Sequence, residues 1–434
     1  MQFFTEICDT GGPWITIYKP QTGKLVYLCF IAVGTAFSML VFSPIIRSFL
    51  IAHTDFCEEV LSHEKCDILS GHVVLYRIHY GMILYFFLLA FCNCQISLFS
   101  PYVTQFENGL WFPKFNLFCI FLLLAIYIPE GTGQIIMHVG WIVGFLFLLF
   151  QLFLMIDFAH AMNNFWVERM ETSPRPGVWY ISLLLLSSIA YTIAGTFILY
   201  FYFVYTAVDG CQTNKFFIAV STVLCIISSI ISIHPKIRET GLLQASIVCC
   251  YTTYLMWSAL SHSPELKCNP SWSTIAIKEL DLHLEPEMFL DLGIMYLLLV
   301  YGIMRVDSIS KFLGSMNFVG CYRKDTDLEQ QGSNATDNDN DQFLKSDYLS
   351  FYMFLMSACL YSLMVLSDFY TPEGVIGTDL EVLEMEDGLM DMNEYTKETS
   401  QRVVVCIKMS VCITFALMYI WSVLAPVIQS SILR

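Results

Sequence analysis

The chain has 434 residues, of which 56% are hydrophobic, 15% aromatic and only 14% charged. A typical soluble domain carries about 25% charged residues, and a soluble protein of this length could not bury so much apolar surface, so a bilayer is the expected environment. The net charge is −16, but the acids cluster in 325–341 and 373–398, and the chain has no basic patch. Nucleic acid is therefore not an expected partner.

Ten apolar runs reach or approach the roughly 20 residues that a helix needs to cross a bilayer. They predict an all-α, polytopic membrane protein with ten transmembrane helices. The first run follows a polar start and is long enough to remain as an anchor, so no cleaved signal peptide is expected. The predicted helices are 25–46, 72–98, 110–128, 134–160, 178–206, 214–233, 241–260, 288–304, 347–369 and 403–425.

The distribution of basic residues predicts the orientation. An even number of helices puts both termini on one side of the membrane. Lysine and arginine are more frequent in the terminal segments and even-numbered loops than in the odd-numbered loops, which places both termini in the cytoplasm. In this topology the sequon Asn334-Ala-Thr336 faces the cytosol, and a glycan on Asn334 would contradict the orientation.

Four cysteines fall in loops that this topology places outside. Cys57 and Cys66 share the first outer loop, while Cys211 and Cys268 lie in the loops after the fifth and seventh helices. An oxidising compartment would allow the pairs Cys57–Cys66 and Cys211–Cys268 to form disulfides. Free thiols are the alternative.

Two polar loops interrupt the helical pattern. Residues 305–346, between the eighth and ninth helices, contain a polar segment of low complexity and are expected to be a disordered cytoplasmic loop. Residues 371–402 are rich in acids. They are expected to form a solvated outer loop, with a short amphipathic helix as the alternative.

Soluble-enzyme motifs are missing. The chain contains no HExxH, no GxSxG, no phosphate-cradling GxxxxGK[ST] and no GxGxxG. It also lacks the clustered carboxylates with which a lipid head-group transferase would hold a metal ion. We therefore expect no catalytic residue, no metal and no cofactor, and the chain is not expected to be an enzyme.

Ionisable residues inside or at the ends of predicted helices are the candidates for function. Such a residue near the bilayer centre costs on the order of 3 kcal/mol, so it usually has a role. The alternative for the two lysines and for the aspartate is a place at the interface, which a lysine reaches by snorkelling. Asp157 and His160 are three positions apart and share a helix face. The candidates for a lipid path or a subdomain interface are Lys114, Glu130, Asp157, His160 and Lys408.

One segment resembles a known family. "LLQASIVCCYTTYLMWSALSHSPELKCNP" (242–270) is similar to the seventh-helix signature of the serine incorporator (Serinc) family. Further blocks follow the family's order, among them "GFLFLLFQLFLMIDFAHAMNNFWVERME" (144–171) and "SIHPKIRETGLLQ" (232–244). The signature residues are Tyr251, Tyr254, Trp257 and Ser258, whose helical spacing is also typical of a packing or interfacial stripe.

The resemblance implies ten transmembrane helices in two subdomains joined by a long diagonal fourth helix. It also implies a lipid-related activity: ATP-independent phospholipid scrambling, or support of serine incorporation into phosphatidylserine and sphingolipids. The alternative is a membrane adaptor that gathers serine-lipid biosynthetic enzymes without transport. The expected partners are membrane phospholipids, with serine, those enzymes and further copies of the chain as candidates. The expected location is the plasma membrane or the endomembranes (ER, Golgi).

Three features of the sequence depart from the family pattern. The cysteine-rich N-terminal segment is reduced to Cys8, Tyr352 stands where the family often has a histidine, and the acidic insertion at 373–400 is longer. N-terminal lipidation and a ninth-helix histidine are therefore not carried over from the family.

Overall fold

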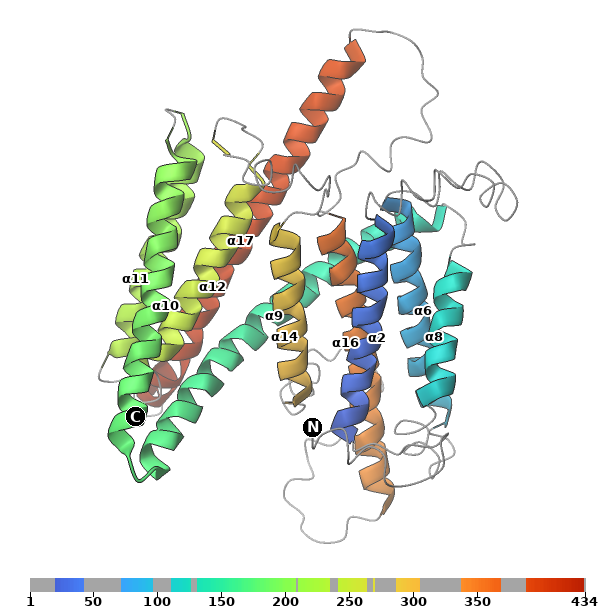
Figure 1. Ribbon diagram of the computed structural model, residues 1–434, viewed down its shortest axis with the longest axis horizontal. Helices are drawn as coiled ribbons and strands as arrows, with labels where there is room; N and C mark the ends of the chain where they lie inside the picture. The colour runs from blue at the N-terminus through green and yellow to red at the C-terminus, as the bar shows by residue number, and fades with distance from the viewer. Residues whose placement is uncertain are drawn as a thin grey trace. The chain divides into compact units, whose positions relative to one another are not determined.

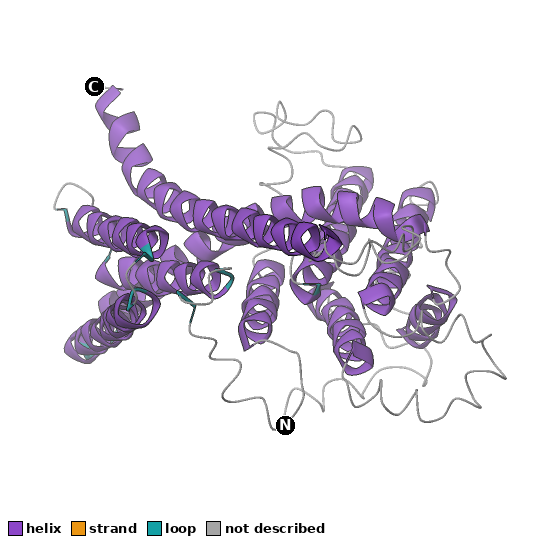
Figure 2. Cartoon of the chain, turned by 90° about the horizontal axis from the view of Figure 1, so that it is seen from above, coloured by secondary structure: helices purple, strands orange, loops and turns teal. Residues whose placement is uncertain are grey.

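The computed structural model describes residues 20–42, 72–96, 111–125, 131–207, 210–234, 241–263, 268–269, 286–304, 337–367 and 388–432. All regular structure in these ranges is helical (Figure 2). The helices, labelled in Figure 1, are α2 (Pro20–Phe42), α6 (His72–Ile96), α8 (Trp111–Ala125), α9 (Gly131–Thr172), α10 (Pro176–Tyr205), α11 (Gln212–Ile233), α12 (Leu242–Ser261), α14 (Pro286–Met304), α16 (Asp337–Leu366) and α17 (Gly388–Ile432).

The chain folds into two compact units. Unit 1 comprises Met1–Leu148 and Leu282–Tyr370, and unit 2 comprises Leu149–Asp281 and Thr371–Arg434. Unit 1 therefore contains α2, α6, α8, α14 and α16, and unit 2 contains α10, α11, α12 and α17. Helix α9 is continuous and contributes residues to both units, changing from unit 1 to unit 2 after Leu148.

Seven of the described helices are long and apolar enough to cross a membrane. Helices α8 and α16 contain shorter apolar stretches, Trp111–Ala125 and Phe351–Leu366. Helix α12 has 20 residues, but glutamine, serine and threonine side chains along it reduce its mean hydropathy. The chain is thus a multi-pass helical membrane protein. The seven candidate spans are Gly23–Leu40, Leu75–Asn93, His138–Thr172, Pro176–Tyr205, Gln212–Ile233, Glu287–Met304 and Arg402–Ala425.

Helix α11 shows why a lipid environment suits this chain. Its buried face is a row of small and polar side chains at helical spacing, including Asn214, Ser221, Ser228 and Ser232. Its exposed face carries large apolar side chains such as Phe216, Val223, Ile226 and Ile230. A helix of a soluble protein has the opposite pattern, whereas small residues between helices and apolar residues outside are typical of a membrane protein.

Helix α12 is the centre of unit 2. It packs against α10, α11 and α17, and most of its side chains are buried. Tyr251 of α12 lies edge-on to Phe415 of α17, with ring centroids 4.9 Å apart. The hydroxyls of Thr252 and Thr253 donate to carbonyls one turn earlier in the same helix, so they are buried without being left unpaired.

Close helix contacts in unit 1 depend on glycine. A Cβ added at Gly81 of α6 would lie 2.9 Å from the backbone oxygen of Phe121 in α8. A Cβ at Gly144, in the "GWIVG" segment of α9, would lie 3.0 Å from Met364 of α16. At Gly81 the neighbouring atom is backbone, so only glycine allows α6 and α8 to come this close. At Gly144 the neighbouring atom belongs to the Met364 side chain, which would have to shift to admit a methyl group.

Three helices are longer than the sequence predicted. Helix α9 continues past residue 160 to Thr172, because 145–172 contains no glycine or proline and Pro174 is the first breaker. Helix α16 begins at Asp337, so 337–346 is helical and the prediction of a disordered loop over 305–346 is wrong there. Helix α17 begins at Gly388, so the prediction of a solvated loop over 371–402 is wrong for 388–402. The alternative of a short amphipathic helix was closer to the observed structure there.

The physical reason is the same for α16 and α17. Residues 337–366 contain no glycine or proline, and 389–425 contain none either, so nothing in the backbone stops a membrane helix from continuing into a polar segment. Acids at the start of a helix also interact favourably with its dipole. The polarity of a segment therefore did not decide whether it was helical. The parts of the two predicted loops at 305–336 and 371–387 lie outside the described residues.

Candidate functional site

Lys114 of α8 is buried among aromatic side chains in unit 1, with 3% of its surface exposed. Its Nζ donates a 2.8 Å hydrogen bond to the hydroxyl of Tyr27 in α2. The hydroxyl of Tyr352 in α16 donates to the same Tyr27 oxygen at 3.0 Å. The Lys114 ammonium also lies 4.8 Å from the ring centre of Trp111 and 5.3 Å from that of Tyr27. Lys114 thus joins three helices and does not reach outward as a snorkelling lysine would.

Sequence reasoning missed the groups around Lys114. Lys24 of α2 is also buried, with its Nζ 5.5 Å from the ring centre of Phe351. Two buried cations therefore lie over rings of the aromatic cluster around Tyr27, and each gains from the negative face of a ring. Tyrosines inside apolar runs at 27 and 352 were the available signal, since a buried tyrosine hydroxyl needs a partner.

His160 is the centre of a polar cluster in unit 2. Its Nε2 lies 3.0 Å from Nε2 of Gln244 in α12 and 3.3 Å from Oγ of Ser422 in α17. Asp157, one turn earlier in α9, is half-buried like His160. His160 therefore connects α9 to α12 and α17, and of these partners the sequence singled out none. Gln244 lay inside the quoted signature block but looked like an ordinary helix residue.

Lys408 and His262 form a second ionisable pair in unit 2. The Nζ of Lys408 in α17 lies 3.2 Å from Nδ1 and 3.1 Å from Nε2 of His262, which follows α12. Nδ1 of His262 is 2.9 Å from the carbonyl oxygen of Ser258, so it is the nitrogen that donates there. Both side chains are half-buried. Sequence reasoning found Lys408 but not its histidine.

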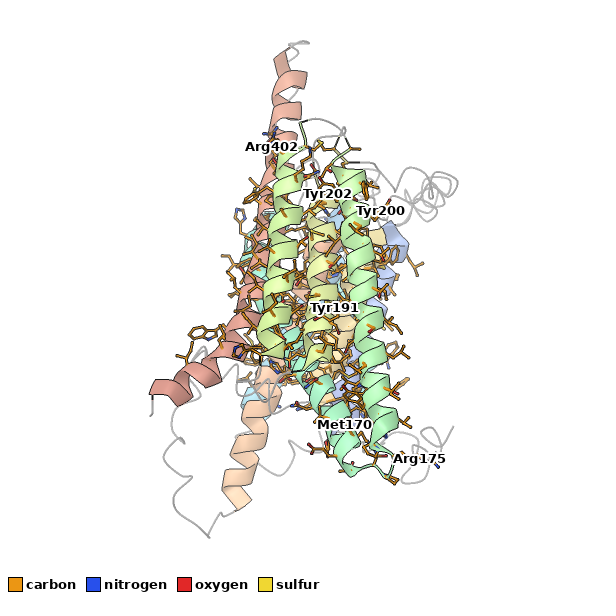
Figure 3. The ribbon with its side chains drawn as sticks, turned by 90° about the vertical axis from the view of Figure 1, so that its left-hand side faces the viewer. Met170, Arg175, Tyr191, Tyr200, Tyr202 and Arg402 are labelled. Atoms are coloured by element: carbon orange, nitrogen blue, oxygen red, sulfur yellow. A yellow bond between two sulfur atoms is a disulfide. The ribbon has the colours of Figure 1, made fainter. Side chains whose placement is uncertain are left out.

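The two clusters of unit 2 belong to opposite ends of its helices. His160 contacts Ser422, near the end of the candidate span Arg402–Ala425 of α17, while Lys408 lies near the start of that span. Figure 3 shows Met170 and Arg175 at one end of these helices and Tyr200, Tyr202 and Arg402 at the other. The two clusters thus lie toward opposite ends of this candidate span.

A disulfide joins Cys211 and Cys268, the second of the two pairs expected from the sequence, with Cα atoms 5.7 Å apart. The amide of Asn214 donates to the carbonyl oxygens of Tyr205 and Cys268 at 3.2 and 3.3 Å. Gly210 precedes Cys211 with φ of +117°, a conformation that glycine adopts at low cost. These contacts join the end of α10 and the start of α11 to Cys268.

The signature residues of α12 are packing residues in this structure. Tyr251 and Tyr254 stack with ring centroids 5.9 Å apart, and Tyr254 and Trp257 are 6.1 Å apart. Ser258 is buried. Tyr254 and Trp257 are half-buried, and a packing or interfacial stripe remains the interpretation of these residues.

Other predicted positions lie outside the described residues, namely Glu130, Cys57 and Cys66. Within the described part of the chain, no group of three or more histidine, cysteine or acidic side chains is placed to hold a metal ion. The roles of the ionisable residues in lipid handling remain predictions, although their positions are now defined.

The comparison with known proteins accounts for the blocks found in the sequence. Residues 14–431 match the family described as Serine incorporator (Serinc). A probable serine incorporator of Nematostella vectensis is 32% identical over 438 aligned residues, which cover 95% of this chain and 91% of that protein. Serine incorporator 3 of Bos taurus is 30% identical, covering 94% of this chain and 91% of that protein.

The match to human serine incorporator 5 is more local, with 32% identity over 48% of this chain and 50% of that protein. The family match, in contrast, extends over nearly the whole chain and includes the helices that carry Lys114, His160, His262 and Lys408. The chain therefore belongs to the serine incorporator (Serinc) family.

Proposed function

We propose that this protein moves phospholipids between the two leaflets of a membrane without ATP. The observation that carries the proposal is the set of half-buried ionisable residues in unit 2, namely His160, which contacts Gln244 and Ser422, and Lys408, which contacts His262. A charged head group pays a large free-energy cost to enter hydrocarbon, and polar side chains at membrane depth lower that cost. Half-buried groups suit this role because they are held by the protein and still accessible.

The interior of unit 2 contains small hydroxyl side chains. On the buried sides of α11 and α12 these include Ser221, Ser228 and Thr252. Ser228 and Thr252 donate to carbonyl oxygens of their own helices, so the helices pack closely without leaving these buried donors unpaired. The family's two-subdomain arrangement, with ten spans, a diagonal α9 and cytoplasmic termini, is part of the proposal.

The direct test is lipid exchange in liposomes. Purified full-length protein is reconstituted with fluorescent phospholipids, and dithionite bleaches only the outer leaflet. Without the protein, dithionite should bleach only the half of the fluorescence that lies in the outer leaflet. With the protein, we expect bleaching to go beyond this half, because labelled lipids from the inner leaflet reach the outer one. Equal bleaching in both samples would remove the proposal.

Two variants locate the activity. Lys408→Gln removes the charge from the half-buried pair and is expected to slow lipid exchange several-fold. Lys215→Gln is the matched control, because Lys215 lies in the first turns of α11 in the same unit and is exposed. An equal rate for both variants would contradict a role for the Lys408–His262 pair.

The names of the relatives favour a second candidate, support of serine incorporation into lipids. In this role the protein would gather serine and serine-using enzymes at the membrane. It predicts more labelled serine in phosphatidylserine and sphingolipids when the protein is expressed, and co-purification of the enzymes. If expression of the protein left serine labelling of lipids unchanged while the purified protein exchanged lipids, the transport function would be supported over this second candidate.

A further inference from the structure

The start of α12 lacks a capping side chain. Gly241 precedes the helix in an extended conformation and has no side chain to accept from the first-turn N–H groups. Such N–H groups have no partner within their own helix. The hydroxyl of Ser232 in α11 donates to the carbonyl oxygen of Gly241 at 2.9 Å, which joins the start of α12 to α11. The positive end of a 20-residue helix is therefore held in a defined position without a side-chain cap.

Asn163 of α9 lies against this helix start. It is 4% exposed, and its Oδ1 has no hydrogen-bond partner among the residues that the structure describes. A Cβ added at Gly241 would collide with the Asn163 amide, so the glycine is what admits this side chain. A buried amide without its hydrogen bond costs free energy unless a ligand or water supplies the partner.

Gln244 repeats the observation in the first turn of α12. Its side chain is fully buried, with Nε2 near His160 and with Oε1 unpartnered among the described residues. The oxygen and nitrogen of an amide are assigned from their contacts and can be exchanged. In either orientation one end of the Gln244 amide lacks a partner. Two buried amides at one helix start thus have unused hydrogen-bonding capacity.

Tryptophan side chains next to the start of α12 indicate its depth in the membrane. Trp166, one turn after Asn163 in α9, packs against Trp179 of α10 with ring centroids 5.3 Å apart. Tryptophan is enriched at the level of the head groups. Met170 and Arg175 mark the same end of the unit in Figure 3. The tryptophan pair therefore favours a position of the α12 start near the level of the lipid head groups.

We propose that the N-terminus of α12, with the amides of Asn163 and Gln244, binds the phosphate of a phospholipid. The N–H groups and the helix dipole favour an anion. An amide NH₂ adds a donor once it is turned toward the phosphate. The inference rests on the proposed lipid function and names the part of the lipid that is recognised.

The test compares two aspartates at neighbouring positions. Asn163→Asp keeps the size of the side chain and places a negative charge beside the helix start, where it repels phosphate. Asn164→Asp adds the same charge one residue later on an exposed side chain. Binding of phosphatidylglycerol to the purified full-length protein is measured by thermal stabilisation and native mass spectrometry, with diacylglycerol as the lipid without phosphate.

We expect Asn163→Asp to weaken phosphatidylglycerol binding by about tenfold or more relative to Asn164→Asp, with diacylglycerol binding equal in both. Equal phosphatidylglycerol affinity, or tighter binding by Asn163→Asp, would overturn the site and leave Asn163 as a packing residue of α9. The melting temperatures of the two unliganded variants are measured as the control for folding.

Inorganic phosphate distinguishes the source of the ligand. Competition by millimolar phosphate supports recognition of the phosphate group from any source, while its failure to compete with the lipid supports recognition of lipid-borne phosphate. The proposed phosphate site and the proposed lipid transport can be contradicted independently of each other. A wild-type protein that shows this binding difference without lipid exchange keeps the site and loses the proposed transport.

Discussion

The two units bury polar groups in different ways. In unit 1 the cations of Lys24 and Lys114 are enclosed by aromatic rings and almost fully buried. In unit 2 the ionisable residues His160, His262 and Lys408 are half-buried and contact other polar side chains. Unit 1 thus holds its charges by ring faces and a tyrosine hydroxyl, whereas unit 2 leaves its charges accessible.

The difference suggests a division of labour. A fully enclosed charge contributes to a fixed helix arrangement, because it must keep its few partners. A half-buried charge can exchange partners with a ligand at a lower cost. We therefore expect substitutions in unit 1 to act mainly on stability and those at the half-buried residues of unit 2 to act mainly on lipid movement. Four predictions test this comparison.

The largest effect is expected for the disulfide of unit 2. Cys211→Ser removes a cross-link between residues 57 positions apart. Loop closure of this size is worth about 4 kcal/mol in the chain-entropy picture. Thermal unfolding of the protein in detergent, with and without reductant, measures the loss. Reductant should lower the melting temperature of the wild type and leave that of Cys211→Ser unchanged. If reductant left the melting temperature of the wild type unchanged, the disulfide would not contribute to stability.

The next effect concerns the enclosed lysine of unit 1. Tyr27→Phe removes the hydroxyl that accepts from Lys114 and is expected to destabilise the protein by about 2–3 kcal/mol, because a buried cation loses a hydrogen bond. Lys114→Met in the same chain removes the charge and should restore much of this loss. Denaturant titration of the four proteins in a double-mutant cycle gives the coupling. Additive effects would contradict the enclosed-charge description.

A pair of glycines compares backbone packing in the two units. Gly81→Ala in unit 1 places a methyl group 2.9 Å from a backbone oxygen that cannot move aside easily, and should cost about 1–3 kcal/mol. Gly195→Ala in α10 of unit 2 meets nothing within 4 Å and should stabilise the helix by up to about 1 kcal/mol. Denaturant titration measures the change in the free energy of unfolding for both variants. Equal signs for the two changes would refute the packing argument.

The smallest effect on stability is expected at the half-buried Asp157. Asp157→Asn keeps the shape of the side chain and removes its charge, so we expect a loss of less than about 1 kcal/mol and a changed rate of lipid exchange. Liposome exchange and thermal unfolding are measured on the same preparation. Wild-type values in both would assign Asp157 to the membrane interface alone.

The sequence by itself determined the class of the protein and the approximate positions of its helices. Long apolar runs require helices in a bilayer, because backbone groups find no other partners there. The same runs located Lys114, His160 and Lys408 as unusual, and the signature around Tyr251 identified the family. The lengths of α9, α16 and α17 were underestimated, because polarity was taken as the end of a helix and only glycine or proline would have ended it.

The tertiary structure decided which residues meet. Tyr27 with Lys114, His262 with Lys408, and Gln244 with His160 are far apart in the chain, and no spacing rule relates them. The contact of Asn163 with Gly241 depends on how α9 packs against the start of α12, which local periodicity does not encode. A sequence pattern fixes the face of each helix, but partners across helices arise only when the faces are packed together.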